Sequence, residues 1–124
     1  MAVETRGIRH IHLMVADHDR SVSFYKAVFG MEIGFRDGHI LFLHSPNNHD
    51  DLALHLAVSD EEKSRVGIQG GCEHFGITVK DRGQLDDCIA LVIAAGGALH
   101  DKGEHAPGVP YAYVTDPDGY LIEI

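Results

Sequence analysis

Basic residues, cysteines and long apolar runs are all scarce in this chain of 124 residues. Lysine and arginine total 10 against 19 aspartates and glutamates, which gives a formal net charge of −9. Because nucleic-acid binding is driven by basic surface, this balance argues against a nucleic-acid partner. No apolar run approaches the length of a membrane span, which argues against a membrane protein. Residues 1–7 form no apolar signal segment, so we expect a cytoplasmic protein.

The two cysteines, Cys72 and Cys88, are too far apart for a CxxC motif, and nothing indicates a secreted protein. We therefore expect two buried thiols and no disulfide. Apolar residues make up 44% of the chain and charged residues 23%, which is ordinary for a globular protein. A chain of this length has room for one core, or for two small modules that share it.

A phrase of eight residues occurs twice, beginning at His10 and at His74. Both copies read histidine, two residues, an aliphatic residue, one residue, valine, one residue and aspartate. Side chains alternate between the two faces of an extended strand, so each copy predicts a strand that opens with an imidazole. The repeat indicates two copies of one structural unit, each placing a histidine at a shared point.

The segments after each copy follow the same order, which is typical of a βαβββ module. The first half predicts a strand at 8–15, a helix capped by Asp17 or Asp19 and ended by Gly30, and strands at 31–36, 39–43 and 51–58. The second half predicts a strand at 72–79, a helix at 84–95, and strands at 98–102, 111–115 and 120–124, with a loop at 103–110. We predict an α+β fold over residues 1–124, a single domain whose modules span about 8–58 and 72–124 and are connected by 59–71. The two modules would form a curved mixed sheet around a cavity.

Glu123 lies in the last predicted strand, between Ile122 and Ile124. Because side chains alternate, Glu123 faces the opposite side from the two isoleucines and needs water or a partner there. One histidine on a strand is more often structural than a ligand. Two histidines in equivalent places, with a carboxylate closing the second unit, favour a metal site that keeps open positions for substrate.

These phrases resemble the vicinal oxygen chelate superfamily of glyoxalases, extradiol dioxygenases, fosfomycin-resistance enzymes and bleomycin-binding proteins. The resemblance covers nearly the whole chain and is carried by residues 10–17, 21–25, 29–30, 74–81 and 116–123. It implies paired modules around a metal-binding cavity, with His10, His74 and Glu123 as ligands. Iron(II) or manganese(II) is the expected metal, with zinc(II) or nickel(II) as alternatives. The resemblance also implies a small-molecule substrate and a homodimer, and it leaves open whether the site lies within one chain or between two.

The fourth ligand position separates the reactions of this superfamily. Glyoxalases carry a second glutamate in the last strand of the first module, and alignment of 52–54 with 122–124 puts Ala53 there. Alanine cannot bind a metal, so the remaining set resembles the extradiol dioxygenase triad, with room for a chelating diol and dioxygen. A register shift of two residues would instead make His55 a fourth ligand. His12 is expected either to line the cavity beside His10 or to be structural.

Extradiol enzymes also use a loop histidine as acid–base and a tyrosine near the metal. His105 and Tyr113 are the matching residues, and His105 could take a diol proton and return it. The alternatives are a solvated loop histidine and a core aromatic residue. The sequence thus predicts a ring-cleaving dioxygenase acting on a vicinal diol. A metal-dependent lyase, isomerase or thiol transferase of the same superfamily, and a metal-free drug-binding protein, remain as alternatives.

Overall fold

The computed structural model describes residues 1–124 and confirms the repeated βαβββ order. The first module consists of β1 (Ile11–Val15), α1 (His18–Phe29), β2 (Glu32–Asp37), β3 (Ile40–His44) and β4 (Leu52–Leu56). A short helix, α2 (Asp60–Ser64), follows. The second module consists of β5 (Phe75–Gly76), η1 (Arg82–Gln84), α3 (Leu85–Ala94), β6 (Ala98–Ala106), β7 (Val109–Thr115) and β8 (Leu121–Glu123). None of the helices has the length and apolar character needed to cross a membrane.

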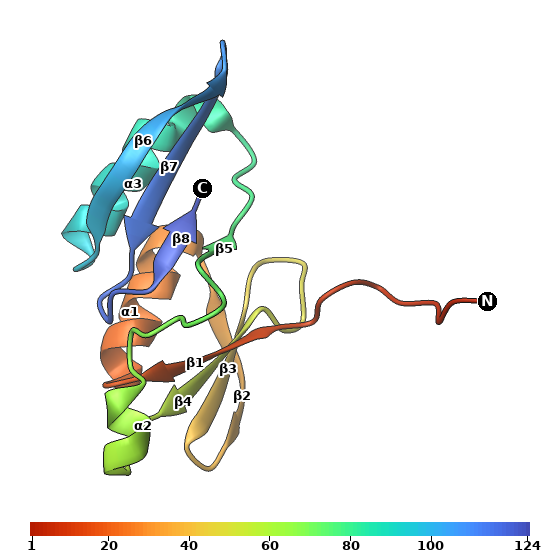
Figure 1. The fold of residues 1–124 in the computed structure, drawn as a ribbon, viewed down its shortest axis with the longest axis vertical. Helices are drawn as coiled ribbons and strands as arrows, with labels where there is room; N and C mark the ends of the chain where they lie inside the picture. The colour runs from red at the N-terminus through yellow and green to blue at the C-terminus, as the bar shows by residue number, and fades with distance from the viewer.

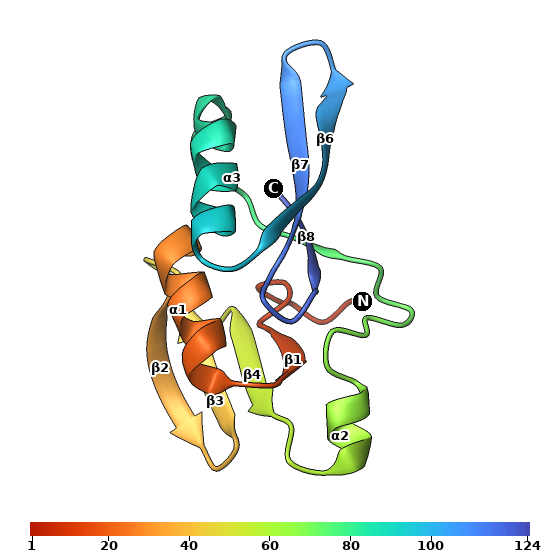
Figure 2. The ribbon, with the colours of Figure 1, turned by 90° about the vertical axis from the view of Figure 1, so that its left-hand side faces the viewer.

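The strands form two four-stranded mixed sheets, in the orders β1-β4-β3-β2 and β5-β8-β7-β6. In each sheet the first pair is parallel and the other pairs are antiparallel. Helix α1 packs on one face of the first sheet and α3 on one face of the second, and the two helices follow one another along one side of the molecule (Figures 1 and 2). We call the opposite side of each sheet, which neither α1 nor α3 covers, its open face. The predicted α+β fold is confirmed.

Alternation along the strands decides which side chains reach the core. In β3, Leu41 and Leu43 are buried against the helix side, whereas Phe42 and His44 are only half-buried. One cluster of 17 buried hydrophobic residues includes side chains of both modules. The shared core holds the two modules together, and neither α1 nor α3 covers the open faces.

The motifs that carry the resemblance also join the modules. The Tyr25 hydroxyl in α1 donates to Asp116 Oδ2 at 2.7 Å, and both residues are buried. The other oxygen of Asp116 accepts the backbone N–H groups of Asp118 and Tyr120, and this closes the turn before β8. The Tyr120 hydroxyl in turn donates to the backbone oxygen of Met14 in β1, at 2.7 Å. Burial raises the pKa of Asp116 and raises that of Tyr25 well above its ordinary value.

The prediction of a loop at 103–110 is wrong. Strand β6 continues to Ala106 and β7 begins at Val109, so the two strands make one long hairpin with a short turn (Figure 2). Gly103 lies opposite Tyr111, and a Cβ atom there would sit only 2.9 Å from the tyrosine hydroxyl oxygen. The glycine therefore permits a close strand contact and does not mark a loop. His105 lies in a strand, at a register shift between Glu104 and Ala106.

The prediction of two buried thiols is also wrong, because Cys72 is exposed and Cys88 only partly buried. The strand expected at 72–79 is limited to Phe75–Gly76, so Cys72 stands before it in an irregular segment. The alternation that would have turned the thiol toward the core does not extend that far.

Candidate metal centre

The strand pairing places His10 and His74 in equivalent positions. Ile11 pairs with Leu52 in the first sheet, and Phe75 pairs with Ile122 in the second. Each histidine stands one residue before its paired strand. Each also meets an aromatic ring edge-on from the third strand of its module, with ring centres 5.7 Å apart for His10 and Phe42 and 5.0 Å for His74 and Tyr113.

A carboxylate faces Nδ1 of both histidines. Nδ1 of His10 lies 2.8 Å from Asp50 Oδ2, and Nδ1 of His74 lies 3.1 Å from Glu73 Oε1. Because a carboxylate only accepts hydrogen bonds, the short contact with Asp50 needs a proton on Nδ1 of His10, and in that neutral tautomer Nε2 keeps a free lone pair. The longer contact from Arg9 Nε to the same Nδ1, at 3.4 Å, belongs to the other tautomer. Carboxylate support of this kind fixes the tautomer and orientation of metal-binding histidines.

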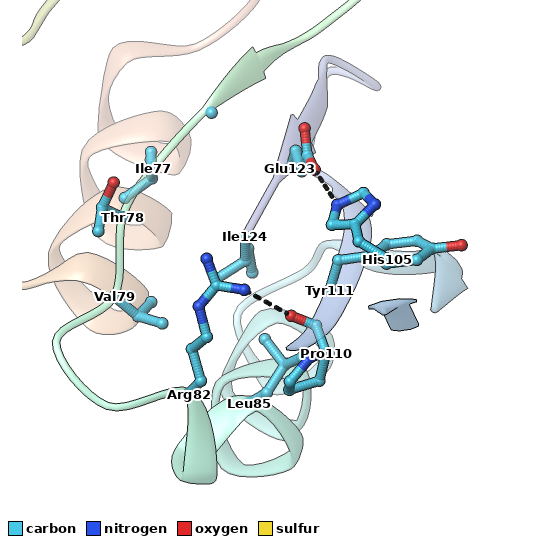
Figure 3. A pocket seen from close by; sticks show the side chains of 11 residues that line it. Ile77, Thr78, Val79, Arg82, Leu85, His105, Pro110, Tyr111, Glu123 and Ile124 are labelled. Carbon is cyan, nitrogen blue, oxygen red and sulfur yellow. Dashed lines mark hydrogen bonds and ion pairs between the residues drawn. The ribbon is translucent and has the colours of Figure 1, made fainter. Parts of the chain in front are cut away.

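Glu123 is the centre of the hydrogen bonds on the open face of the second sheet. Its two carboxylate oxygens lie 2.9 Å from Nε2 of His105 and 3.1 Å from Nε2 of His74 (Figure 3 shows the His105 contact). The hydrogen bond from His105 is the main cause of the lowered pKa of Glu123, followed by that from His74. Glu123 is therefore held as a carboxylate between two imidazoles, a donor set that suits a divalent cation.

Two tyrosines complete this side of the site. Tyr113 pairs with Glu123 across β7 and β8, and burial is the main cause of its raised pKa, with the charge of Glu123 second. Tyr111 stacks on His105 with ring centres 4.3 Å apart. The register shift in β6 lies next to this stack, and such shifts re-aim side chains at active sites.

His10 makes no hydrogen bond or ion pair with the Glu123 group. His10 and His74 line one cavity of about 1020 Å³, whereas Glu123 and His105 line another of about 280 Å³. No three histidine, cysteine or carboxylate side chains of the chain have the spacing of a preformed metal site. Of the five residues predicted from the sequence, the structure thus brings together His74, Glu123, His105 and Tyr113, and it leaves His10 apart.

The position equivalent to Glu123 is Ala53. Ala53 pairs with His12 in the first sheet as Glu123 pairs with Gly76 in the second, so the alternative register with His55 is wrong. His55 instead bridges two neighbours. Its Nε2 lies 3.0 Å from Glu62 Oε2, and its Nδ1 lies 3.1 Å from Nε2 of His12. Burial, and after it the charge of His55, lower the pKa of His12.

The residues that hold the imidazoles were not predicted from the sequence. Asp50 and Glu62 belong to irregular or connecting segments, and only the fold brings them to histidines 40 and 7 positions away. For Glu62 the signal was available, because Ser59 followed by Glu62 is a capping-box pattern, and the structure forms both of its hydrogen bonds. Asp50 sits in a run of polar residues with no pattern that singles it out.

Comparison with known proteins places the chain in a family. Residues 7–124 match the Glyoxalase/Bleomycin resistance protein/Dioxygenase superfamily, and the chain belongs to it. A 2,2',3-trihydroxybiphenyl dioxygenase of Sphingomonas paucimobilis is 27% identical over 125 residues, which are 95% of this chain and 40% of that protein. A probable lactoylglutathione lyase of Vibrio cholerae is 32% identical over 128 residues, which are 94% of this chain and 88% of that protein.

The solved structure of a glyoxalase-related enzyme from Fulvimarina pelagi superposes with a TM-score of 0.69 at 26% identity. The match covers 97% of this chain and 87% of that one. The chain spans well under half of the dioxygenase but most of the lyase. The similar proteins thus include enzymes of two reaction classes, an oxidoreductase and a lyase.

Proposed function

We propose that the protein is a divalent-metal-dependent enzyme of this superfamily, an extradiol-type dioxygenase that cleaves a vicinal diol ring. His10, His74 and Glu123 are the ligands, and iron(II) or manganese(II) is the metal. The observation that carries the proposal is the orientation of the histidines. Asp50 supports His10 through Nδ1, and His74 directs Nε2 at Glu123, 3.1 Å away. Bound there, the metal would act as a Lewis acid that chelates both diol oxygens and supplies electrons to dioxygen.

His105 is the proposed acid–base. Its Nε2 donates to Glu123, which leaves Nδ1 as an acceptor for a diol proton. The stack with Tyr111 keeps the ring in one plane, while half of the side chain stays open to solvent and substrate. Tyr113 keeps its hydroxyl proton because its pKa is raised, so it is a hydrogen-bond donor for a bound oxygen.

We propose that two copies of the chain share each site as a homodimer. His10 is held by its own module, whereas His74 and Glu123 face the open side of the other sheet. A second copy could bring its His10 to the first copy's Glu123 and cover both open faces. The same pairing would protect the sheet edges.

The reaction is tested with protein purified anaerobically and loaded with iron(II). Oxygen uptake with a panel of catechols, measured at an oxygen electrode, is the expected result. Replacement of His105 by Asn should slow uptake by about 100-fold, the usual size of acid–base catalysis, and leave iron bound. No uptake with any diol, together with turnover of a hemithioacetal, would refute the dioxygenase.

A lyase acting on a hemithioacetal is the second candidate, because the probable lactoylglutathione lyase of Vibrio cholerae matches this chain over 88% of its own length. Ala53 weighs against it, since the register leaves that position without a carboxylate. An Ala53→Glu variant separates the two readings. This variant should turn over a hemithioacetal faster than the unaltered chain only if the other residues that the lyase reaction needs are already present.

A further inference from the structure

The cavity that holds Glu123 and His105 also contains an arginine. Arg82 comes from η1, and its guanidinium enters the side of the cavity opposite the Glu123 carboxylate (Figure 3). The wall also carries apolar side chains, Ile77, Val79 and Leu85 among them. The cavity therefore has one end with Glu123 and His105, apolar side chains in its wall and a cationic end.

Two hydrogen bonds of the chain orient the turn that carries Arg82 and its guanidinium. Asp81 caps η1 by accepting the backbone N–H of Gly83 at 2.8 Å, which sets the start of this turn. Nη1 of Arg82 donates to the carbonyl oxygen of Pro110 at 3.3 Å. That carbonyl belongs to β7, so the guanidinium is tied to the strand that also carries Tyr111 and Tyr113.

The guanidinium of Arg82 forms no ion pair within the chain. No carboxylate lies within ion-pair distance of its guanidinium. Asp86, four residues further along and on the same side, pairs with Lys102 instead, at 3.6 Å. An arginine with a single carbonyl partner keeps most of its donor fork for a ligand, and that fork matches a carboxylate.

We infer that Arg82 is the anion-binding residue of this cavity, and that the substrate is a small vicinal diol carrying a carboxylate. The inference rests on the proposed function for the diol end and on Arg82 for the acidic end. The cavity of about 280 Å³ lies at the small limit of ligand pockets, roughly 300–1,000 Å³, which suits a compound of one ring. The diol faces Glu123, the ring lies against the apolar side chains, and the carboxylate meets the guanidinium.

Binding to manganese(II)-loaded protein under argon tests this without turnover. The probes are protocatechuate, which is a catechol with a carboxylate, and its neutral amide, both measured by calorimetry. Arg82→Gln should weaken protocatechuate binding by about tenfold and leave the affinity for the amide unchanged. The loss is smaller than for a buried charged pair because Arg82 is exposed. Arg82→Lys should lose only part of the affinity, because it keeps the charge without the fork.

Lys102→Gln is the matched control, since it removes a nearby positive charge that pairs with Asp86 and does not line the Glu123 cavity. It should leave both affinities unchanged. Equal binding of the acid and the amide by the unaltered protein would overturn the inference and leave the proposed function standing. An equal loss of affinity in both variants would also overturn it. Binding of neither probe would overturn the diol function and this inference together.

Discussion

At the scale of single residues, the site depends on carboxylates that hold imidazoles. Asp50 has one oxygen on His10 and Arg9, while its other oxygen is buried without a hydrogen-bond partner. Its charge is therefore balanced mainly through the oxygen that faces His10. The orientation of His10 depends on a residue 40 positions away, whereas that of His74 depends on its immediate neighbour Glu73.

Replacement of Asp50 by Asn should lower metal affinity by about 10–100-fold, the usual effect of losing a carboxylate behind a ligand histidine. The amide can no longer accept as a charged group, so the tautomer of His10 is less strongly fixed. Calorimetric titration of the metal-free protein with the metal measures the change in affinity. Asp37→Asn, in the exposed β2–β3 hairpin, is the control and should bind metal like the unaltered chain. Equal affinity in the two variants would remove Asp50 from the site.

Glu62 predicts a pH dependence of stability. Hydrogen bonds from the backbone of Ser59 and then Val58 lower its pKa from 4.5 to about 2. A lowered folded pKa stabilises the fold above the unfolded value, and this contribution is lost as pH falls from about 4.5 towards 2. The unaltered chain should therefore lose its advantage over Glu62→Gln on acidification. Urea unfolding at pH values between about 3 and about 6 measures the difference. Glu61→Gln, which removes an exposed ion pair with Arg65, should show a small difference that hardly changes with pH.

Sequence patterns point to the proposed ligands but not to the residues that support them. The repeated phrase marks His10 and His74, each one residue before a strand, and alternation in the last strand marks Glu123. Asp50 and Arg82 reach the site from irregular segments or a single turn, where no periodicity says which way a side chain points. Partners of this kind are specified by tertiary structure, and only the folded chain reveals them.

At the scale of elements, a buried hydrogen bond from Tyr25 to Asp116 connects α1 to the turn before β8. Tyr25→Phe removes the hydroxyl and leaves a buried carboxylate oxygen of Asp116 without its donor. The expected loss is about 1–3 kcal/mol in the free energy of unfolding. Chemical denaturation gives the value. Tyr111→Phe removes a hydroxyl that makes no hydrogen bond in the chain, so it should cost much less. An equal loss in both variants would contradict the assigned role of Tyr25.

The hairpin of β6 and β7 shows where local rules fail. Glycine and proline at 103, 107, 108 and 110 favour a loop. The strands nevertheless pair through most of this stretch, because Gly103 makes room for Tyr111 and Pro110 lies opposite Glu104 in a part of β7 that has no partner in β8. Helix α1 was easier to predict, since Asp17 caps it and Gly30 ends it in the left-handed conformation as expected, whereas α2 lies in the segment predicted as a connector.

At the scale of the whole molecule, the arrangement of the site between copies can be tested by mixing two inactive variants. His10→Ala and His74→Ala should each fail to bind metal at the proposed site. If ligands come from two copies, a mixed dimer contains one site with both histidines and one with neither. Refolding the variants together should then restore metal binding and activity to about a quarter of the unaltered level, since half of the random dimers are mixed. No recovery would show that each site is built within one chain.

The hydrogen bonds between the modules also bear on how the chain is made. The Tyr25 hydroxyl donates to a residue 91 positions later in the sequence, and the backbone oxygen of Met14 accepts from a residue 106 positions later. During synthesis the first module is complete in sequence long before either partner leaves the ribosome. Loops of this length close slowly. A nascent first half therefore holds α1 without its anchor, and chaperone binding or premature association with another chain has its widest opportunity before residues 116–120 emerge.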